Sequence, residues 1–360
     1  MIFAVWGRFI RVLKFSCRTI WFLFFCGCLS PVDFETENIG GKLVVSGQIS
    51  TIPEQNFVEL GRTADTDRLP VPVSGAAITL TDDLGQSFFY QEDLSRPGMY
   101  QLPDVAGLPG RSYYIQVVTA EGESYGSLSE RMPASSGELT ATYEVAREDF
   151  IDFEGISSTQ SFFKIYVNSI LPTPPDVYIR WTVMEAFLLS PTDFPDPFGN
   201  VPPPCFILQN ADPQRIVLFN GEDVKTSSVE NVLVTSRIVD WSFFEKHVFT
   251  VYQSAMTRDA VEYWRKVNIV ANQVGSIFDT PPAEINGNVK NLNTPGEKVY
   301  GYFQAVNETY YRFPIYKEDI PYPLLMSNCT YDNRDFQSYP ARCLDCMSQR
   351  NSTYIRPPWF

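Results

Sequence analysis

The sequence contains a single histidine, His247, among 360 residues, and this scarcity restricts the chemistry that the chain can perform. Serine and cysteine triads of the usual kind place a histidine beside the nucleophile, so each would have to use this one residue. The sequence also lacks a Gly-x-Ser-x-Gly elbow, a Gly-x-x-x-x-Gly-Lys phosphate loop and a His-Glu-x-x-His zinc helix. We therefore expect a protein that is not an enzyme and that binds no metal and no cofactor.

A long apolar run is missing from the start of the chain. The run over residues 20–26 has only seven residues, whereas a membrane-spanning helix needs about 20. Four basic residues precede it, Arg8, Arg11, Lys14 and Arg18, and no acidic residue occurs among the first 27. This order of a basic and then an apolar segment is typical of a secretory signal peptide. We expect residues 1–27 to be removed.

The segment Phe25-Cys26-Gly27-Cys28 resembles a lipobox, in which a small residue precedes the cysteine that receives diacylglycerol. It departs from the usual pattern at Phe25, where lipoproteins commonly carry leucine. The alternative is an ordinary cleaved signal peptide with a bystander cysteine. From this resemblance we predict lipidation at Cys28, with residues 28–41 as a lipidated tether. Several acyl chains together hold a protein firmly to a membrane.

Positive charge is scarce after this segment. Residues 28–360 contain 24 basic and 42 acidic residues and carry a net charge of −18. Such a charge repels phosphates, so we expect no nucleic-acid partner. With this many acidic residues, chance pairs of carboxylates are expected, and their number is no evidence for a glycosidase-like site.

Four cysteines follow Cys28, at positions 205, 329, 343 and 346, and an even number in an exported chain indicates two disulfides. In each of the three possible connectivities, Cys205 pairs with Cys329, Cys343 or Cys346. One bridge therefore closes more than a hundred residues, and in the chain-entropy model such a bridge contributes on the order of 4–5 kcal/mol. Cys343 and Cys346 have the spacing of a redox motif, but no βαβ pattern surrounds them, so we favour structural disulfides.

Short alternating segments separated by turns predict a mainly β fold. Ile78–Thr81 and Ser87–Tyr90 flank the turn at 82–85 and indicate a hairpin, and Tyr113–Val118 reads as a further strand. We expect an antiparallel β-sandwich domain over residues 42–136. A second β-rich domain over residues 137–360 is predicted to carry at least one packed helix and a disulfide-stapled C-terminal tail.

The predicted helix lies near residues 257–274. Thr257 is its expected N-cap and Gly275 its stop. Five residues form one apolar stripe along it: Ala260, Trp264, Val267, Ala271 and Val274. A single stripe favours packing on the protein's own sheet.

The segment over residues 190–205, rich in proline, aspartate and phenylalanine, interrupts the second β-rich region. A loop of this length is often functional, and Phe194 and Phe198 are our candidates for contact with a partner. The alternative is a rigid surface arm that Cys205 holds in place.

Two resemblances follow from longer motifs. The run from Pro72 to Asp82, with Gly98-Met99-Tyr100 and the segment 110–114, resembles the transthyretin-like or carboxypeptidase-regulatory sandwich, a scaffold without chemistry of its own. Nearly all of the mature chain is similar to a family of Bacteroidota outer-membrane lipoproteins known only as a domain of unknown function. The segments that carry this second resemblance are Leu43–Gly47, Val73–Ala76, Ala260–Trp264, Ile285–Val289, Gly301–Phe303, Cys343–Cys346 and Pro357–Phe360.

The family resemblance implies an accessory or binding protein that partners a TonB-dependent outer-membrane β-barrel in uptake or surface-complex assembly. It implies a lipid-anchored protein of the outer membrane, and we expect the cell surface rather than the periplasmic face. Two alternatives stay open: a surface hydrolase of glycan or peptide, and an adhesion or envelope-structural module.

Overall fold

The computed structural model describes residues 40–64, 70–151, 155, 157–172, 177–189, 203–222, 226–272, 285–324, 329 and 338–360. The fold is mainly β, with curled, sandwich-like sheets and one helix longer than two turns in the part that is described. This confirms the predicted fold class.

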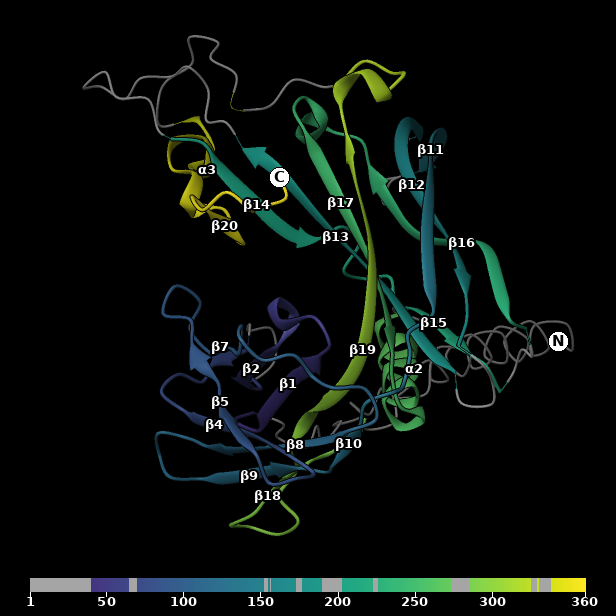
Figure 1. Cartoon of the computed structure of the whole chain (residues 1–360). Helices are drawn as coiled ribbons and strands as arrows, with labels where there is room; N and C mark the ends of the chain where they lie inside the picture. Colours follow the sequence, from purple (N-terminus) through teal and green to yellow (C-terminus); the bar gives the residue numbers. More distant parts are fainter. Residues whose placement is uncertain are drawn as a thin grey trace, which may run out of the picture. The chain divides into compact units, whose positions relative to one another are not determined.

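Three sheets account for the described strands (Figure 1). The large sheet has the order β20 (Ser352–Thr353), β14 (Cys205–Asn210), β13 (Tyr178–Leu189), β17 (His247–Ala255), β19 (Tyr300–Ile315), β1 (Leu43–Ser50), β2 (Phe57–Arg62), β7 (Met99–Gln101) and β6 (Gln91–Glu92). In addition, β15 (Val217–Asn220) pairs with β13, and β3 (Val71–Pro72) pairs with β2.

The other two sheets are smaller. One has the order β18 (Val289–Asn291), β9 (Ser124–Ser127), β8 (Ser112–Val118), β4 (Ala77–Asp82) and β5 (Ser87–Phe89), with β10 (Glu130–Arg131) beside β8. The other consists of β11 (Glu138–Ile151), β12 (Ser157–Ile170) and β16 (Ser228–Ile238). The helices are α2 (Arg258–Asn272) and α3 (Ala341–Leu344), with the 3₁₀ turns η1 (Pro53–Gln55), η2 (Trp241–Phe243), η3 (Lys317–Asp319) and η5 (Cys346–Ser348).

The predicted hairpin is confirmed and has a local cause. Strands β4 and β5 pair antiparallel, with Thr81 opposite Ser87. The Asp82 carboxylate accepts hydrogen bonds from the backbone N–H groups of Leu84 and Gln86, and Gly85 has φ +81°. An aspartate that folds back on its own turn and a glycine with positive φ are the residues that such a turn requires.

Strand β19 connects two hydrophobic cores. Its first half pairs in parallel with β1, and Phe303 and Ala305 lie in the core between the large sheet and the β8 sheet. Its second half pairs with β17, and Ile315 lies in the core between the large sheet and the β11–β12–β16 sheet. The N-terminal sandwich therefore takes β18 and part of β19 from residues 289–315, a long-range pairing for which the sequence carries no local signal.

Two glycine motifs meet where β19 enters the sandwich. Gly301 has φ +92° and lies against the carbonyl group of Val45, and Gly287 lies against the carbonyl group of Gly301. The Asn288 side chain then donates to the carbonyl oxygen of Phe303 (2.7 Å) and accepts from the Phe303 N–H (2.9 Å), as a neighbouring strand would. These motifs thus have a structural explanation, since only glycine permits backbones to approach so closely.

Helix α2 packs on the large sheet, as the apolar stripe predicts. Its buried residues Ala260 and Val261 join Tyr178, Tyr302 and Val306 in one apolar cluster. The predicted stripe is wrong at its end, because Ala271 is exposed. The apolar contacts of the helix in this cluster stop at Trp264, so its last turn extends beyond the surface that covers its start. Val274 lies outside the described residues.

Candidate functional site

Strand β15 and helix α2 lie next to each other (Figure 1). A pocket of about 770 Å³ lies between them. Strand β15 and the segment before it supply one wall, and five residues of α2 supply the other. The helix residues are Val261, Glu262, Arg265, Asn268 and Asn272, whose spacing places them on one side of the helix. The remaining lining residues are Asp212, Gln214, Arg215, Ile216, Val217, Leu218, Phe219 and Asn220.

The pocket is lined by both apolar and polar side chains and carries both signs of charge. Arg265 donates to the Glu262 carboxylate one helical turn away (2.8 Å). Arg215 donates to the carbonyl oxygen of Leu233. Neither Arg215 nor Asp212 takes part in any of the ion pairs that the described residues form. The pocket therefore offers a ligand one carboxylate and one guanidinium group that have no ionic partner among the described residues.

A buried polar network fixes the N-terminus of α2 and thereby the position of the pocket wall. Thr257 accepts from the Ala260 N–H (3.2 Å) and is the predicted N-cap. Its hydroxyl donates to the carboxylate of Glu130 (2.7 Å), which also accepts from Tyr302 (2.5 Å) and Asn288 (3.2 Å). Glu130 is only 5% exposed, and its negative charge near the first turn complements the helix dipole.

Burial raises the pKa of Glu130 above its usual 4.5, against the hydrogen bonds from Tyr302, Thr257 and Asn288. The folded state therefore holds this proton more tightly than the unfolded state does. This group therefore increases the free energy of unfolding as the pH falls toward 4.5. The increase is lost as the pH rises through the pKa that Glu130 has in the folded state.

Replacement of Glu130 by glutamine is expected to remove this pH dependence. The amide keeps one acceptor for Tyr302 and Asn288, so the variant should unfold with a free energy within about 1 kcal/mol of the wild type at neutral pH. In urea titrations between about pH 8 and about pH 5, the free energy of unfolding of the wild type should rise relative to that of the variant as the pH falls. A constant difference across this range would contradict the raised pKa.

Arg180 of β13 contacts α2. Its guanidinium group stacks on the Trp264 ring, with 4.1 Å from Cζ to the ring centroid. Its Nε atom is buried without a hydrogen-bond partner among the described residues. Burial lowers its pKa to about 10, although the nearby charge of Glu308 acts in the opposite direction. This contact, worth up to about 2 kcal/mol when desolvated, helps to hold the helix on the sheet.

The single histidine belongs to a buried cluster in the second core. The His247 ring is fully buried and stacks on Phe243 and Phe249. One ring nitrogen lies 3.1 Å from the Glu185 carboxylate and the other 3.3 Å from the carbonyl oxygen of Ser242. Both ring nitrogens therefore have partners inside the core, as is typical of a histidine that stabilises the fold.

Arg237 brings a second charge to Glu185 and connects two sheets. It donates from β16 to both carboxylate oxygens of Glu185 on β13, at 3.2 and 3.0 Å, and Gln209 donates to the same carboxylate (2.7 Å). Burial acts to raise the pKa of Glu185, but the hydrogen bond from His247 and the charge of Arg237 outweigh it, so this pKa lies below its usual value.

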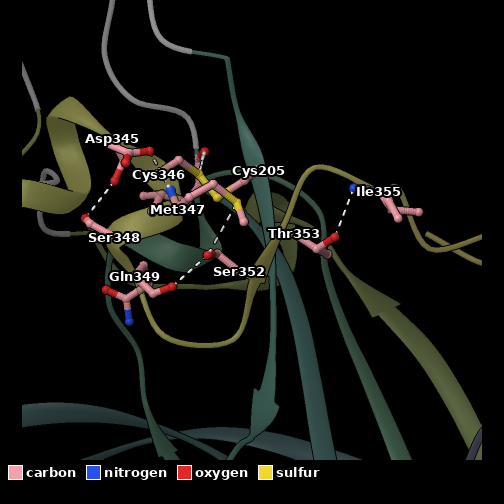
Figure 2. The surroundings of a disulfide bond; sticks show 10 residues. Cys205, Asp345, Cys346, Met347, Ser348, Gln349, Ser352, Thr353 and Ile355 are labelled. Atoms are coloured by element: carbon pink, nitrogen blue, oxygen red, sulfur yellow. Dashed lines mark hydrogen bonds between the residues drawn. A yellow bond between two sulfur atoms is a disulfide. The ribbon is translucent and has the colours of Figure 1, made fainter. Parts of the chain in front are cut away.

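Both predicted disulfides are present. Cys205 pairs with Cys346 (Figure 2). Cys329 pairs with Cys343. The two cysteines with redox-motif spacing thus belong to different bridges. The first bridge joins residues separated by 141 positions, for which the chain-entropy model gives about 5 kcal/mol.

The long bridge fastens the C-terminal segment to one edge of the large sheet. Cys205 begins β14, and β20 pairs with the same strand, with Phe206 opposite Thr353. Phe360 contacts Phe206 edge to face, with 5.0 Å between ring centroids. The outer edge of β14 is therefore covered, as protein sheets commonly require.

The predicted partner residues Phe194 and Phe198 and the predicted lipidation site Cys28 lie outside the described residues, so these predictions stand as they are. None of the helices that the structure describes is long and apolar enough to cross a membrane. The sequence did not predict the pocket residues. Only the helical periodicity that predicts α2 indicated one wall of the pocket.

Comparisons with known proteins give one informative match. No curated protein matches the chain. Among solved structures, a pullulanase complexed with maltotriose from Anoxybacillus sp. LM18-11 is 13% identical over 58% of this chain, with a TM-score of 0.16. The match spans only 24% of the pullulanase chain, and likeness at this level carries no argument. The model of a domain of unknown function, DUF4249, matches residues 30–312. The chain therefore belongs to the DUF4249 family.

Proposed function

We propose that this protein is a lipid-anchored, non-catalytic binding protein of the Bacteroidota outer membrane. The observation that carries the proposal is that all four cysteines after Cys28 form disulfides. Disulfides form and persist in oxidising compartments such as the periplasm and the cell surface. They agree with a signal peptide that ends at a lipidated Cys28.

The binding role rests on the kinds of site that the described residues form. His247, on which a triad of the usual kind would depend, is buried between aromatic rings with both nitrogens engaged. The pocket between β15 and α2, in contrast, is a surface that a ligand can fill, and its volume is within the usual range for binding sites, about 300–1,000 Å³.

The partner that we propose is a TonB-dependent outer-membrane β-barrel, which the chain assists in uptake or in surface-complex assembly at the cell surface. The support is the resemblance of nearly all of the mature chain to lipoproteins associated with such transporters. An anchor at Cys28 would place the binding domains within reach of a barrel in the same membrane.

Affinity purification of the full chain from detergent-solubilised outer membranes tests this role. We expect a β-barrel transporter to co-purify, since both proteins share one membrane. A Cys28→Ser chain is the matched control and should leave the membrane fraction because it has no lipid. Recovery of the wild-type protein without any β-barrel, or retention of the Cys28→Ser protein in the membrane, would contradict the proposal.

A further inference from the structure

Strand β15 lines the pocket, and among the described residues its edge is unpaired at Leu218. Among the described residues it pairs only with β13, and Gly221 just after it donates from its N–H to the carbonyl oxygen of Val177 (2.8 Å). Hydrogen-bonded and non-hydrogen-bonded pairs alternate along an antiparallel ladder. Phe219 and Val217 therefore bond toward β13, whereas the N–H and C=O groups of Leu218 point away from it.

These outward groups face the pocket. A cavity above one face of a strand touches alternate residues, but this pocket is lined by every residue of β15 from Val217 to Asn220. The pocket thus runs along the strand's edge. Within the part of the chain that is described, neither the N–H nor the C=O of Leu218 has a backbone partner.

The neighbouring part of the same sheet edge is treated differently. Strands β14 and β15 lie along the same side of β13, and β14 is covered by β20 and the disulfide-fastened C-terminal segment. Proteins usually cover or charge a free edge because it pairs readily with another strand. An open strand edge in a preformed pocket is the geometry in which proteins bind an extended peptide as an added strand.

We infer that the groove between β15 and α2 binds an extended polypeptide segment of a partner protein, which pairs with Leu218 as an added strand. Helix α2 forms the second wall, so the occupant must be a single strand rather than the edge of a folded sheet. Asp212 and Arg215 favour a segment that carries side chains of both charge signs. The hydroxyl groups of an oligosaccharide can form hydrogen bonds with these groups, but they supply no ionic partner for the two charges.

The inference is independent of the lipid anchor, and its test uses a different readout from the test of the proposed function. Phage-displayed linear heptapeptides are selected on the full chain in detergent, and the enriched peptides are synthesised. We expect the synthetic peptides to bind the wild-type chain. Versions methylated on alternate backbone nitrogens should bind about tenfold more weakly, because each methyl group removes a strand hydrogen bond.

Proline at position 218 tests the same contact from the side of the protein. Leu218→Pro removes an outward N–H and leaves the inward hydrogen bonds to β13 in place, so peptide affinity should fall about tenfold. It also removes a side chain that packs against the apolar cluster of α2, and Leu218→Ala is the control for that loss. Phe219→Pro is the matched control: it removes an inward N–H and should lower the thermal stability of the chain. Exchange of the charges, Asp212→Arg with Arg215→Asp, should change which peptides are selected.

Three results would overturn the inference. The first is the absence of any enriched peptide. The second is peptide affinity that neither backbone methylation nor Leu218→Pro reduces; methylation of the peptide is decisive even where Leu218→Pro impairs folding. The third is binding of maltoheptaose that Arg215→Ala abolishes, which would identify a carbohydrate site instead.

Discussion

Replacement of Gly301 by alanine is expected to prevent the chain from folding stably. The added Cβ would overlap the carbonyl oxygen of Val45 on the neighbouring strand β1, and the residue would have to adopt φ +92°. A left-handed conformation alone costs about 1–2 kcal/mol for a residue with a side chain. The overlap with backbone adds to this, because β1 and β19 cannot separate without breaking the parallel ladder. We expect a total loss above about 4 kcal/mol, measured by urea unfolding.

Gly296 supplies a matched control for this experiment. It has φ +93°, nearly the same as Gly301, but a Cβ built at Gly296 meets nothing within 4 Å. Gly296→Ala should therefore cost only the conformational part, about 1–2 kcal/mol. The difference between the two variants isolates the close backbone approach. Equal stability of the Gly301→Ala and Gly296→Ala proteins would show that the β1–β19 register described here is wrong.

Replacement of Glu185 by alanine is expected to produce the second large effect. The change leaves the Arg237 guanidinium and the Gln209 amide without the carboxylate that they share, inside a region where the Glu185 side chain is fully buried. Breaking a buried ion pair from one side typically costs about 3–5 kcal/mol. The loss should appear as a lower midpoint of urea unfolding at neutral pH.

The pH dependence gives this prediction a second readout. Because the pKa of Glu185 is lowered on folding, its contribution is present above the unfolded value of about 4.5 and is lost as the pH falls through the folded pKa. The difference between wild type and Glu185→Ala should therefore narrow on acidification. Glu148→Gln is the control, since it breaks an exposed pair with Lys164 and should cost less than about 1 kcal/mol. A Glu185→Ala protein as stable as Glu148→Gln would contradict the buried network.

The features that sequence predicted well are those with local causes. The β4–β5 hairpin follows from Asp82 and Gly85, and helix α2 follows from the Thr257 cap and the first residues of its apolar stripe. In each case the residues that specify the element lie within the element or next to it. The exposure of Ala271 marks the limit of this approach, because periodicity does not state how far the covering sheet extends.

The features that sequence missed depend on distant segments. The parallel pairing of β1 with β19 joins Val45 to Gly301, and nothing in either segment names the other. The four cysteines allowed three connectivities, and only the fold selects Cys205 with Cys346. The candidate groove could not be predicted for the same reason. An unpaired strand edge can be recognised only when the neighbouring strands are known, and no sequence pattern around Leu218 indicates one.

The identity and modification of the mature N-terminus test most directly whether this protein is exported and lipid-anchored. Mass spectrometry of the N-terminal peptide from purified outer membranes reports the first residue and its modification together. We predict that the peptide begins at Cys28 and carries the mass of a diacylglyceryl group, with or without a further acyl chain. A mature chain that begins at another residue, or an unmodified Cys28, would contradict the account.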